Sequence, residues 1–107
     1  MVGSIYFIEM PYSDFKQFKG RPVLVFKMIE KEDVLILPLT TNLNRKGIII
    51  GNKDIANGSL RKESVVIVPK ITAIDASLLS SNHLLATLKE ESFNKVTQVL
   101  CAELECK

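Results

Sequence analysis

Hydrophobic residues in this chain of 107 residues form short, nearly continuous runs separated by polar turns, a pattern typical of β-strands. The strongest run covers residues 22–29, and such a run is expected of a strand buried on both faces. The charged residues 30–33 then form a turn, and residues 34–39 return as an apolar partner strand. We therefore predict a central strand joined to its neighbour as a hairpin.

Other apolar runs predict further strands at residues 2–10, 48–50 and 64–71. Pro38 cannot donate a backbone hydrogen bond, so we expect an edge or a bulge near the end of its strand. Residues 51–63 are rich in turn formers and contain an Asn-Gly pair at Asn57. Most of the chain is therefore expected to be β-structure.

The pattern becomes helical near the C-terminus, where apolar residues recur at helical spacing: Phe93, Val96, Val99, Leu100 and Leu104. Thr87, followed three residues later by Glu90, fits a capping box at the start of this helix. A shorter helical turn is predicted over residues 74–79, with Asp75 as its N-cap. The expected class is α+β, mainly β, with one amphipathic C-terminal helix packed against the sheet.

The composition fits a single domain over residues 1–107. Hydrophobic residues make up 47% of the chain, enough for a core in a chain too short for two ordinary domains. The sequence has no run long enough to span a bilayer and no signal-peptide layout, so we expect a cytoplasmic protein without a membrane partner. Cys101 and Cys106 fit no zinc or redox pattern and are expected to be reduced thiols.

The net charge of +2 is unevenly distributed. Residues 1–70 carry eleven Lys or Arg against seven Asp or Glu, whereas residues 71–107 carry three against five. The excess positive charge lies with the predicted strands, where it favours a polyanion such as nucleic acid. A small imbalance is also common on solvated surfaces, and that alternative stays open.

The loop predicted over residues 11–20 mixes lysines with aromatic residues. This mixture suits single-stranded nucleic acid, because rings stack on unpaired bases and lysines hold phosphates. The RNA-binding candidates in this loop are Lys16, Phe18 and Lys19. For each aromatic residue the alternative is a ring folded back over the end of a barrel.

Arg21 follows this loop and precedes a proline, which biases it toward extended backbone. We therefore expect Arg21 to begin the strand, with its guanidinium at the lip of the loop, where it can bind two phosphate oxygens. The end of the next strand and the loop after it add further candidates for a phosphate site: Thr40, Thr41, Asn42, Arg45 and Lys46. A salt bridge for Arg21 and β-propensity for the threonines are the structural alternatives.

Several kinds of chemistry are absent from the sequence. It contains no glycine-rich phosphate loop, nucleophile elbow or paired metal-ligand motif, and His83 is its only histidine. We therefore expect no metal and no cofactor, and we interpret His83 as a surface residue. Cleaving RNA without metal needs a base for the ribose 2′-hydroxyl, cations for the phosphate and an acid for the leaving oxygen.

Five short segments occur in order: GSIYF at residues 3–7, KGRPVLV at 19–25, LPLT at 37–40, ESVV at 63–66 and ITAID at 71–75. This ordered set resembles the MazF/PemK family of toxin endoribonucleases of type II toxin-antitoxin systems, over nearly the whole chain. The resemblance implies an SH3-like small barrel of the CcdB/PemK kind that acts as a homodimer. It also implies metal-independent, sequence-selective cleavage of single-stranded RNA to a 2′,3′-cyclic phosphate and a 5′-hydroxyl, and a cognate antitoxin that covers the RNA groove.

The resemblance carries two family roles over to this chain. Arg21 matches the arginine that stabilises the scissile phosphate, and Thr40 matches the threonine that helps to position it. The sequence departs from the family's usual residues at four positions: Ser4, Ile67, Pro69 and Thr72. Two of these departures replace the acid and base of some members, so the resemblance assigns no general acid or base; the nearest carboxylates in sequence are Glu9 and Asp14.

Two other functions remain open at this level. A gyrase-poisoning toxin of the CcdB type would share the fold, but such toxins depend on apolar and aromatic residues at the C-terminus, and this chain ends in ELECK. A catalytically silent barrel that binds RNA or a protein is favoured if Pro69 and Thr72 mark a lost site. Cleavage of RNA is the leading hypothesis.

Overall fold

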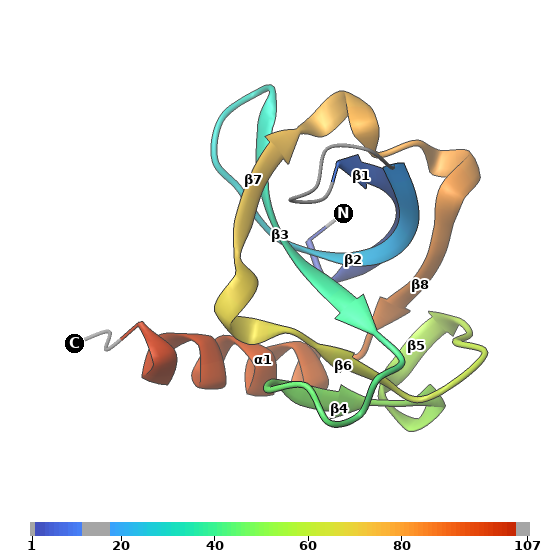
Figure 1. The fold of residues 1–107 in the computed structure, drawn as a ribbon, viewed down its shortest axis with the longest axis vertical. Coiled ribbons are helices and arrows are strands. Elements are labelled where there is room, and N and C mark those ends of the chain that lie inside the picture. Colours follow the sequence, from blue (N-terminus) through green and yellow to red (C-terminus); the bar gives the residue numbers. More distant parts are fainter. Residues whose placement is uncertain (1, 12–17, 105–107) are drawn as a thin grey trace.

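The structure is a computed structural model, and it describes residues 2–11 and 18–104. Its strands are β1 (Ser4–Pro11), β2 (Phe18–Met28), β3 (Asp33–Thr40), β4 (Ile48–Ile50), β5 (Ile55–Gly58), β6 (Ser64–Val66), β7 (Thr72–Asp75) and β8 (Leu84–Leu88). Its helices are α1 (Glu90–Glu103) and the 3-10 helices η1 (Asn52–Asp54), η2 (Val68–Lys70), η3 (Ala76–Leu78) and η4 (Ser81–His83). The strands join in the order β4-β6-β3-β2-β1-β8-β5, with β7 paired to β3 beside this path. Figure 1 shows the sheet curling round on itself, with α1 across its lower end.

The predicted central hairpin is confirmed. β2 lies between β1 and β3, and the antiparallel ladder of β2 and β3 closes through residues 29–32. β2 begins earlier than predicted, at Phe18, because its first half pairs with β1 instead of forming a loop. The expectation that Arg21 begins the strand is therefore wrong: it is an internal residue, opposite Ile8 on β1.

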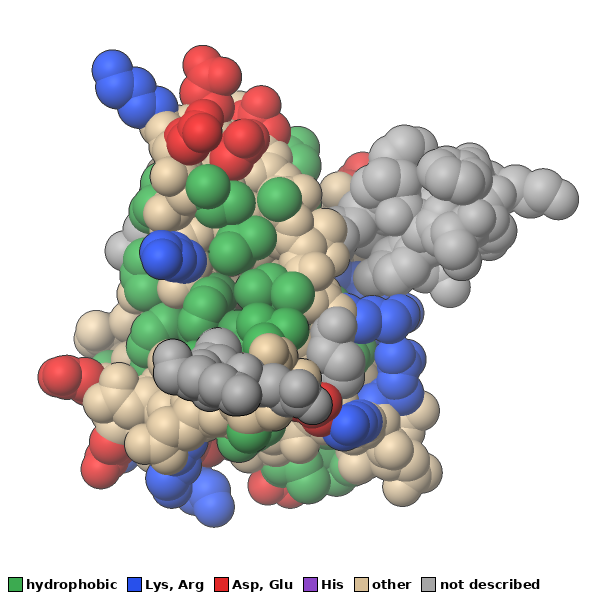
Figure 2. Space-filling view, turned by 90° about the vertical axis from the view of Figure 1, so that its left-hand side faces the viewer, with side chains coloured by type: hydrophobic (Ala, Val, Ile, Leu, Met, Phe, Trp, Pro, Cys, Tyr) green, Lys and Arg blue, Asp and Glu red, His purple; other side chains and the backbone are tan. Residues whose placement is uncertain are grey.

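One side of the sheet carries exposed apolar side chains. β7 pairs with the first half of β3, where Leu35 lies opposite Ala73. The side chain of Leu35 is half-buried and that of Ala73 is exposed. Figure 2 views this side and shows hydrophobic side chains gathered in a band below a cluster of acidic ones. We call the surface marked by Leu35 and Ala73 the β3–β7 face.

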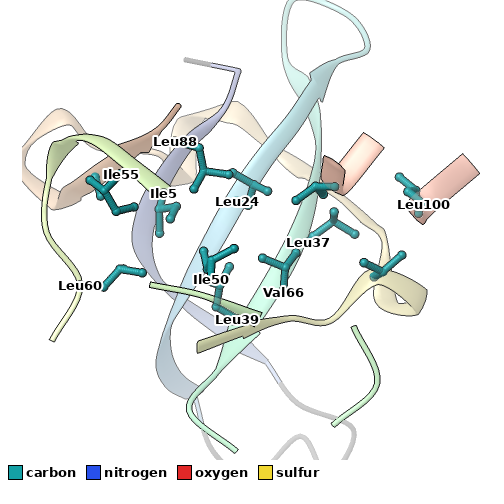
Figure 3. Packing of buried hydrophobic residues seen from close by; sticks show 13 residues of the cluster. Ile5, Leu24, Leu37, Leu39, Ile50, Ile55, Leu60, Val66, Leu88 and Leu100 are labelled. Atoms are coloured by element: carbon teal, nitrogen blue, oxygen red, sulfur yellow. The ribbon is translucent and has the colours of Figure 1, made fainter. Parts of the chain in front are cut away.

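Alternate residues of β2 and β3 supply two hydrophobic cores, one on each face of the sheet. Leu24 and Leu37 belong to the main core, which also contains Leu100 of α1 (Figure 3). Val25 and Ile36 belong to the second core, on the other face. None of these five side chains is more than 2% exposed. This burial on both faces explains the nearly continuous apolar run in the sequence of β2.

Pro38 lies at the point where β3 changes partner. Up to Ile36 the strand pairs with β7, and from Leu39 it pairs with β6. The missing N–H of Pro38 therefore falls between two partner strands, while its carbonyl accepts a hydrogen bond of 2.8 Å from the N–H of Ile67. The edge or bulge predicted from this proline is wrong, because the change of partner accommodates it.

The backbone groups of β2 alternate between its two neighbours. The carbonyl of Val25 accepts a hydrogen bond of 2.8 Å from the N–H of Gly3, which lies on the β1 side. Because successive residues of a strand direct their backbone groups to opposite sides, Leu24 and Pro22 direct theirs toward β3. Leu24 is paired there with Leu37.

Pro22 ends the pairing between β2 and β3. The next hydrogen-bonded pair after Leu24 would join Pro22 to Leu39, but Pro22 has no N–H to donate to that carbonyl. The ladder stops at the pair of Val23 and Pro38, after which β2 stays with β1 and β3 turns toward β6. The two strands therefore diverge from this point.

The sequence pattern does not predict three of the strands, β5, β7 and β8, which are held by long-range pairing. The strand predicted over residues 64–71 is wrong beyond Val66, because the chain leaves β6 there and turns through η2. The helical turn predicted with Asp75 as its N-cap is confirmed as η3. Local apolar content thus identifies the strands of the central hairpin better than the short strands around it.

Helix α1 is confirmed, but the capping box predicted at its start is wrong. Thr87 lies in β8, where its hydroxyl hydrogen-bonds that of Ser4, and the N-cap residue is Lys89, which makes no side-chain cap. Asp54 holds the start of the helix instead. Its carbonyl accepts a hydrogen bond of 2.8 Å from the N–H of Lys89, and its carboxylate accepts one of 2.8 Å from the hydroxyl of Ser92.

The apolar face of α1 is only partly buried. Val96 and Leu100 are buried in the main core, and the ring of Phe93 lies 5.8 Å from that of Phe26, whereas Val99 stays exposed. Among the described residues, no helix is long and apolar enough to cross a membrane.

Replacing Pro22 with alanine should extend the ladder by one pair. The new amide at position 22 faces Leu39 and can donate to its carbonyl, so we expect it to be protected from hydrogen exchange. One added hydrogen bond and the lost rigidity of proline each contribute about 1 kcal/mol or less, with opposite signs, so the free energy of unfolding should change little. Pro38→Ala is the matched control, because its amide would fall between two partner strands. Rapid exchange at position 22 would contradict the prediction.

Asp75 should stabilise the fold only above a certain pH. Its carboxylate accepts a hydrogen bond of 2.8 Å from the backbone N–H of Ser77, and bonds from this backbone and the Ser77 side chain lower the pKa of Asp75 from its ordinary value of 3.8. The stabilisation is present above that value and is lost as the pH falls through the lower folded-state pKa. Urea unfolding should show Asp75→Ala less stable than the natural chain near neutral pH, with a difference that shrinks in acid. Asp75→Asn keeps a capping oxygen and should be the more stable of the two variants; because neither variant titrates at position 75, the difference between them should not vary with pH.

Candidate functional site

A hollow of about 470 Å³ occupies the place where β2 and β3 diverge. We call it the wedge hollow. Its lining comes from β2, the end of β3, the loop after it and β6: Gly20, Arg21, Pro22, Leu39, Thr40, Thr41, Asn42 and Ser64. The structure therefore brings together four of the residues singled out from the sequence: Arg21 on β2, Thr40 at the end of β3, and Thr41 and Asn42 in the loop after it.

Arg21 and Thr40 come from the two diverging strands. Arg21 is half-buried and held by the β1–β2 ladder, and among the described residues that line the wedge hollow it is the one with a charged side chain. Thr40 is the half-buried last residue of β3, and its hydroxyl oxygen accepts a hydrogen bond of 3.2 Å from the N–H of Asn42. A hydroxyl that accepts one bond still has its own hydrogen to donate. A guanidinium and a hydroxyl donor thus share one hollow, an arrangement that suits a phosphate group.

Asn42 shapes the start of the loop between β3 and β4. Its side-chain oxygen accepts a hydrogen bond of 3.1 Å from the N–H of Asn44, and its carbonyl accepts one of 3.2 Å from the N–H of Arg45. Such a side-chain bond two residues ahead is typical of asparagine in turns. The loop therefore leaves β3 in a defined turn, with Thr41 and Asn42 at the wall of the hollow.

Ser64 is a lining residue that the sequence analysis missed. It is the first residue of β6 and is 5% exposed, and its hydroxyl donates a hydrogen bond of 3.2 Å to the carbonyl of Lys62. Its place in the hollow follows from the pairing of β6 with β3 and β4. The residues around Ser64 in the sequence do not indicate this long-range pairing.

A second hollow, of about 490 Å³, adjoins the first and shares Pro22, Thr41 and Ser64 with it. We call it the side hollow. Its other lining residues come from β1, β8 and the connection between β5 and β6: Phe7, Ser59, Leu60, Arg61, Lys62 and Leu85. The local sequence pattern predicts no site in this part of the chain. The two adjacent cations in a turn-rich segment are the signal that would have indicated one.

Two other RNA-binding candidates lie outside the linings of both hollows. Arg45 and Lys46 are exposed on the loop between β3 and β4. Lys46 forms an ion pair with Glu103 on α1, with Nζ and Oε1 2.5 Å apart. An exposed pair of this kind contributes about 1 kcal/mol or less, so it does not prevent Lys46 from exchanging partners.

The remaining candidates fall in the first loop. Lys16 lies outside the described residues. Phe18 and Lys19 belong to β2, where their backbones pair with Pro11 and Met10, and their side chains are outside the description. A role of these residues in RNA binding therefore stays a prediction.

The described lining of the wedge hollow contains no carboxylate and no histidine. Glu9 is exposed and lies directly opposite Gly20 in the β1–β2 ladder, beside the β2 wall of the hollow, while Asp14 is outside the described residues. His83 is exposed in η4, as predicted for a surface residue. Over residues 2–11 and 18–104, no three side chains of the metal-binding types come together as a cation site. The lining therefore offers groups of the kind that bind a phosphate, and among the described residues Glu9 is the neighbouring carboxylate that the ladder identifies.

The fold is similar to that of a solved structure, the Mycobacterium tuberculosis toxin MazF-mt6, with a TM-score of 0.73. The two sequences are 17% identical, and the likeness covers 97% of this chain and 98% of that one. This likeness confirms the expected α+β small barrel with a C-terminal helix.

A search of the curated proteins finds no match to the sequence. The model of one family does match it, over residues 1–104, and that family is described as PemK-like, MazF-like toxin of type II toxin-antitoxin system. The match covers nearly the whole chain and confirms the resemblance found in its five ordered segments. The chain therefore belongs to the PemK-like, MazF-like family of toxins of type II toxin-antitoxin systems.

Proposed function

We propose that this toxin is an endoribonuclease that cleaves single-stranded RNA in a sequence-selective manner and without a metal ion. The observation that carries the proposal is the meeting of Arg21 and Thr40 in the wedge hollow. Membership of the toxin family supports it. The proposal treats residues 1–107 as a single toxin domain that acts in the cytoplasm.

The proposed reaction needs no group beyond the RNA and the protein. The 2′-hydroxyl attacks the adjacent phosphorus and loses its proton to a base, while the bond from phosphorus to the 5′-oxygen breaks and that oxygen takes up a proton. The products are a 2′,3′-cyclic phosphate and a 5′-hydroxyl. Arg21 stabilises the charge that develops on the phosphate oxygens, and Thr40 donates a hydrogen bond to one of them. Glu9, opposite Gly20, is the described carboxylate to test first as a proton carrier.

Replacing Arg21 should affect cleavage more than replacing Thr40. We expect Arg21→Gln to lower the cleavage rate about 100- to 1,000-fold, the usual effect of removing one group that stabilises transition-state charge. Thr40→Val should lower it about 10-fold or less, because it removes one neutral hydrogen bond. Both rates are measured on a long single-stranded RNA in EDTA, with the fragment ends tested for cyclic phosphate and 5′-hydroxyl groups.

Lys31→Gln is the matched control, because Lys31 is an exposed cation at the opposite end of the β2–β3 hairpin. Cleavage that is insensitive to Arg21 would contradict the proposed mechanism. Binding of RNA without any products would identify a binding protein instead. That alternative is supported by the absence of a carboxylate and a histidine from the described lining of the wedge hollow.

We also propose that a cognate antitoxin covers the two hollows and blocks access of RNA. The cations at their walls, Arg21, Arg61 and Lys62, favour an acidic segment of the antitoxin. The same surface of the toxin would then bind both the antitoxin and the RNA.

The proposed assembly is a homodimer formed through the β3–β7 face. Contiguous apolar side chains exposed on a protein surface commonly mark an interaction site, and Figure 2 shows such a band on this face. Leu35 and Ala73 lie opposite each other across the β3–β7 ladder, so a second copy of the chain would cover both together.

Sedimentation should therefore show a species of twice the 12.0 kDa of one chain. Ala73→Glu should raise the dissociation constant of the dimer roughly 100-fold, because a buried unpaired charge costs about 3 kcal/mol. Ile49→Glu places the same charge on β4, at a side chain that is 51% exposed, and should leave the dimer intact. A monomer at all concentrations would exclude the proposed assembly.

A further inference from the structure

We propose that the side hollow holds one unpaired base of the bound RNA, beside the phosphate held in the wedge hollow. The proposal rests on the proposed function, since it takes single-stranded RNA as the ligand. It assigns a role to Phe7, Arg61 and Lys62, which the phosphate chemistry of Arg21 and Thr40 leaves unused.

The two hollows adjoin each other. Pro22, Thr41 and Ser64 line both of them, so a ligand in one lies next to the other. In RNA each base is joined through its ribose to the neighbouring phosphates. A phosphate held near Arg21 therefore places a flanking base within reach of the side hollow.

Phe7 provides a surface on which that base can stack. Its side chain is 42% exposed, although it lies in β1 opposite Pro22, in the middle of the sheet. The ring lies over Gly20 so closely that a Cβ at position 20 would clash with it. Gly20 thus lets the ring lie against the backbone of β2, and the exposed part of the ring faces the side hollow. Stacking of bases on such rings is the main way in which proteins hold single-stranded RNA.

The other walls of the side hollow fit a nucleotide. Leu60 and Leu85 add apolar surface beside the ring, while Arg61 and Lys62 are exposed cations at the same hollow. An aromatic platform next to cations that track a phosphate backbone is typical of single-strand binding sites. A groove for an apolar protein segment would not need two adjacent cations, so the lining favours RNA over such a partner.

The first test measures binding separately from cleavage. The probe is single-stranded RNA with methylated 2′-hydroxyls, which lacks the attacking group. Phe7→Leu keeps an apolar side chain but loses the aromatic face, and we expect binding about 5- to 150-fold weaker, the value of one stacked base. Phe7→Trp restores an aromatic face and should restore the affinity. Thermal unfolding of both variants shows whether the fold is kept.

The second test locates the base. Once cleavage of unmodified RNA has been mapped, a short methylated RNA spanning the cleaved bond is made with one abasic position at a time. At one position beside that bond, the missing base should weaken binding to the natural chain as much as Phe7→Leu does. The same abasic RNA should bind Phe7→Leu with no further loss, because the ring and the base form one contact.

The third test concerns the cations. Arg61→Gln should make the slope of the logarithm of affinity against the logarithm of salt concentration less steep by about 0.7, the value for one phosphate contact on a single strand. Lys31→Gln, at the far end of the hairpin, should leave the slope unchanged.

The outcomes separate this inference from the proposed function. If folded Phe7→Leu binds methylated RNA as tightly as the natural chain does, the side hollow is not a base site and the inference is overturned. If binding depends on Phe7 but unmodified RNA gives no products, the base site stands and the proposed cleavage fails. If the natural chain binds no RNA, both fail.

Discussion

The backbone donor that Pro22 lacks is the constraint on which the candidate site depends. Antiparallel strands stay together while each residue facing its neighbour can exchange hydrogen bonds with it. In β2 this exchange fails after Leu24, so the ladder with β3 ends and the strands separate. Each strand keeps its other neighbour, β1 for β2 and β6 for β3, so the opening between them is held from both sides. Arg21 and Thr40 line this opening, each on a strand that is paired on its other side.

Burial on both faces of β2 and β3 strengthens that arrangement. Val23 and Leu39, the residues next to the site on the two strands, are fully buried, while Arg21 and Thr40 are half-buried. The polar side chains of Arg21 and Thr40 therefore lie at the edge of the two hydrophobic cores. Functional groups placed on well-packed strands need little rearrangement to meet a ligand, which suits electrostatic stabilisation of a reacting phosphate.

The sequence predicts the wedge hollow better than the side hollow, for a physical reason. Arg21 and Thr40 flank the open end of a hairpin whose strands and turn are visible in the local pattern, so their proximity follows from local structure. Phe7, Arg61 and Leu85 belong to segments that only the pairing of β8 with β1 and β5 brings together. Long-range pairing also explains why the position of Arg21 within its strand was missed, since the polar residues before it form strand only because β1 lies beside them.

The way in which Asp54 holds the start of α1 ties the helix to a distant part of the chain. The helix has 14 residues and no side-chain cap of its own, and a helix of that length is only marginally stable in isolation. Its first turn is instead defined by a carboxylate that lies 38 residues away from Ser92 in the sequence. The start of the helix is therefore set by tertiary structure as well as by its own sequence, and a change at Asp54 would alter the first turn of α1 from a distant part of the chain.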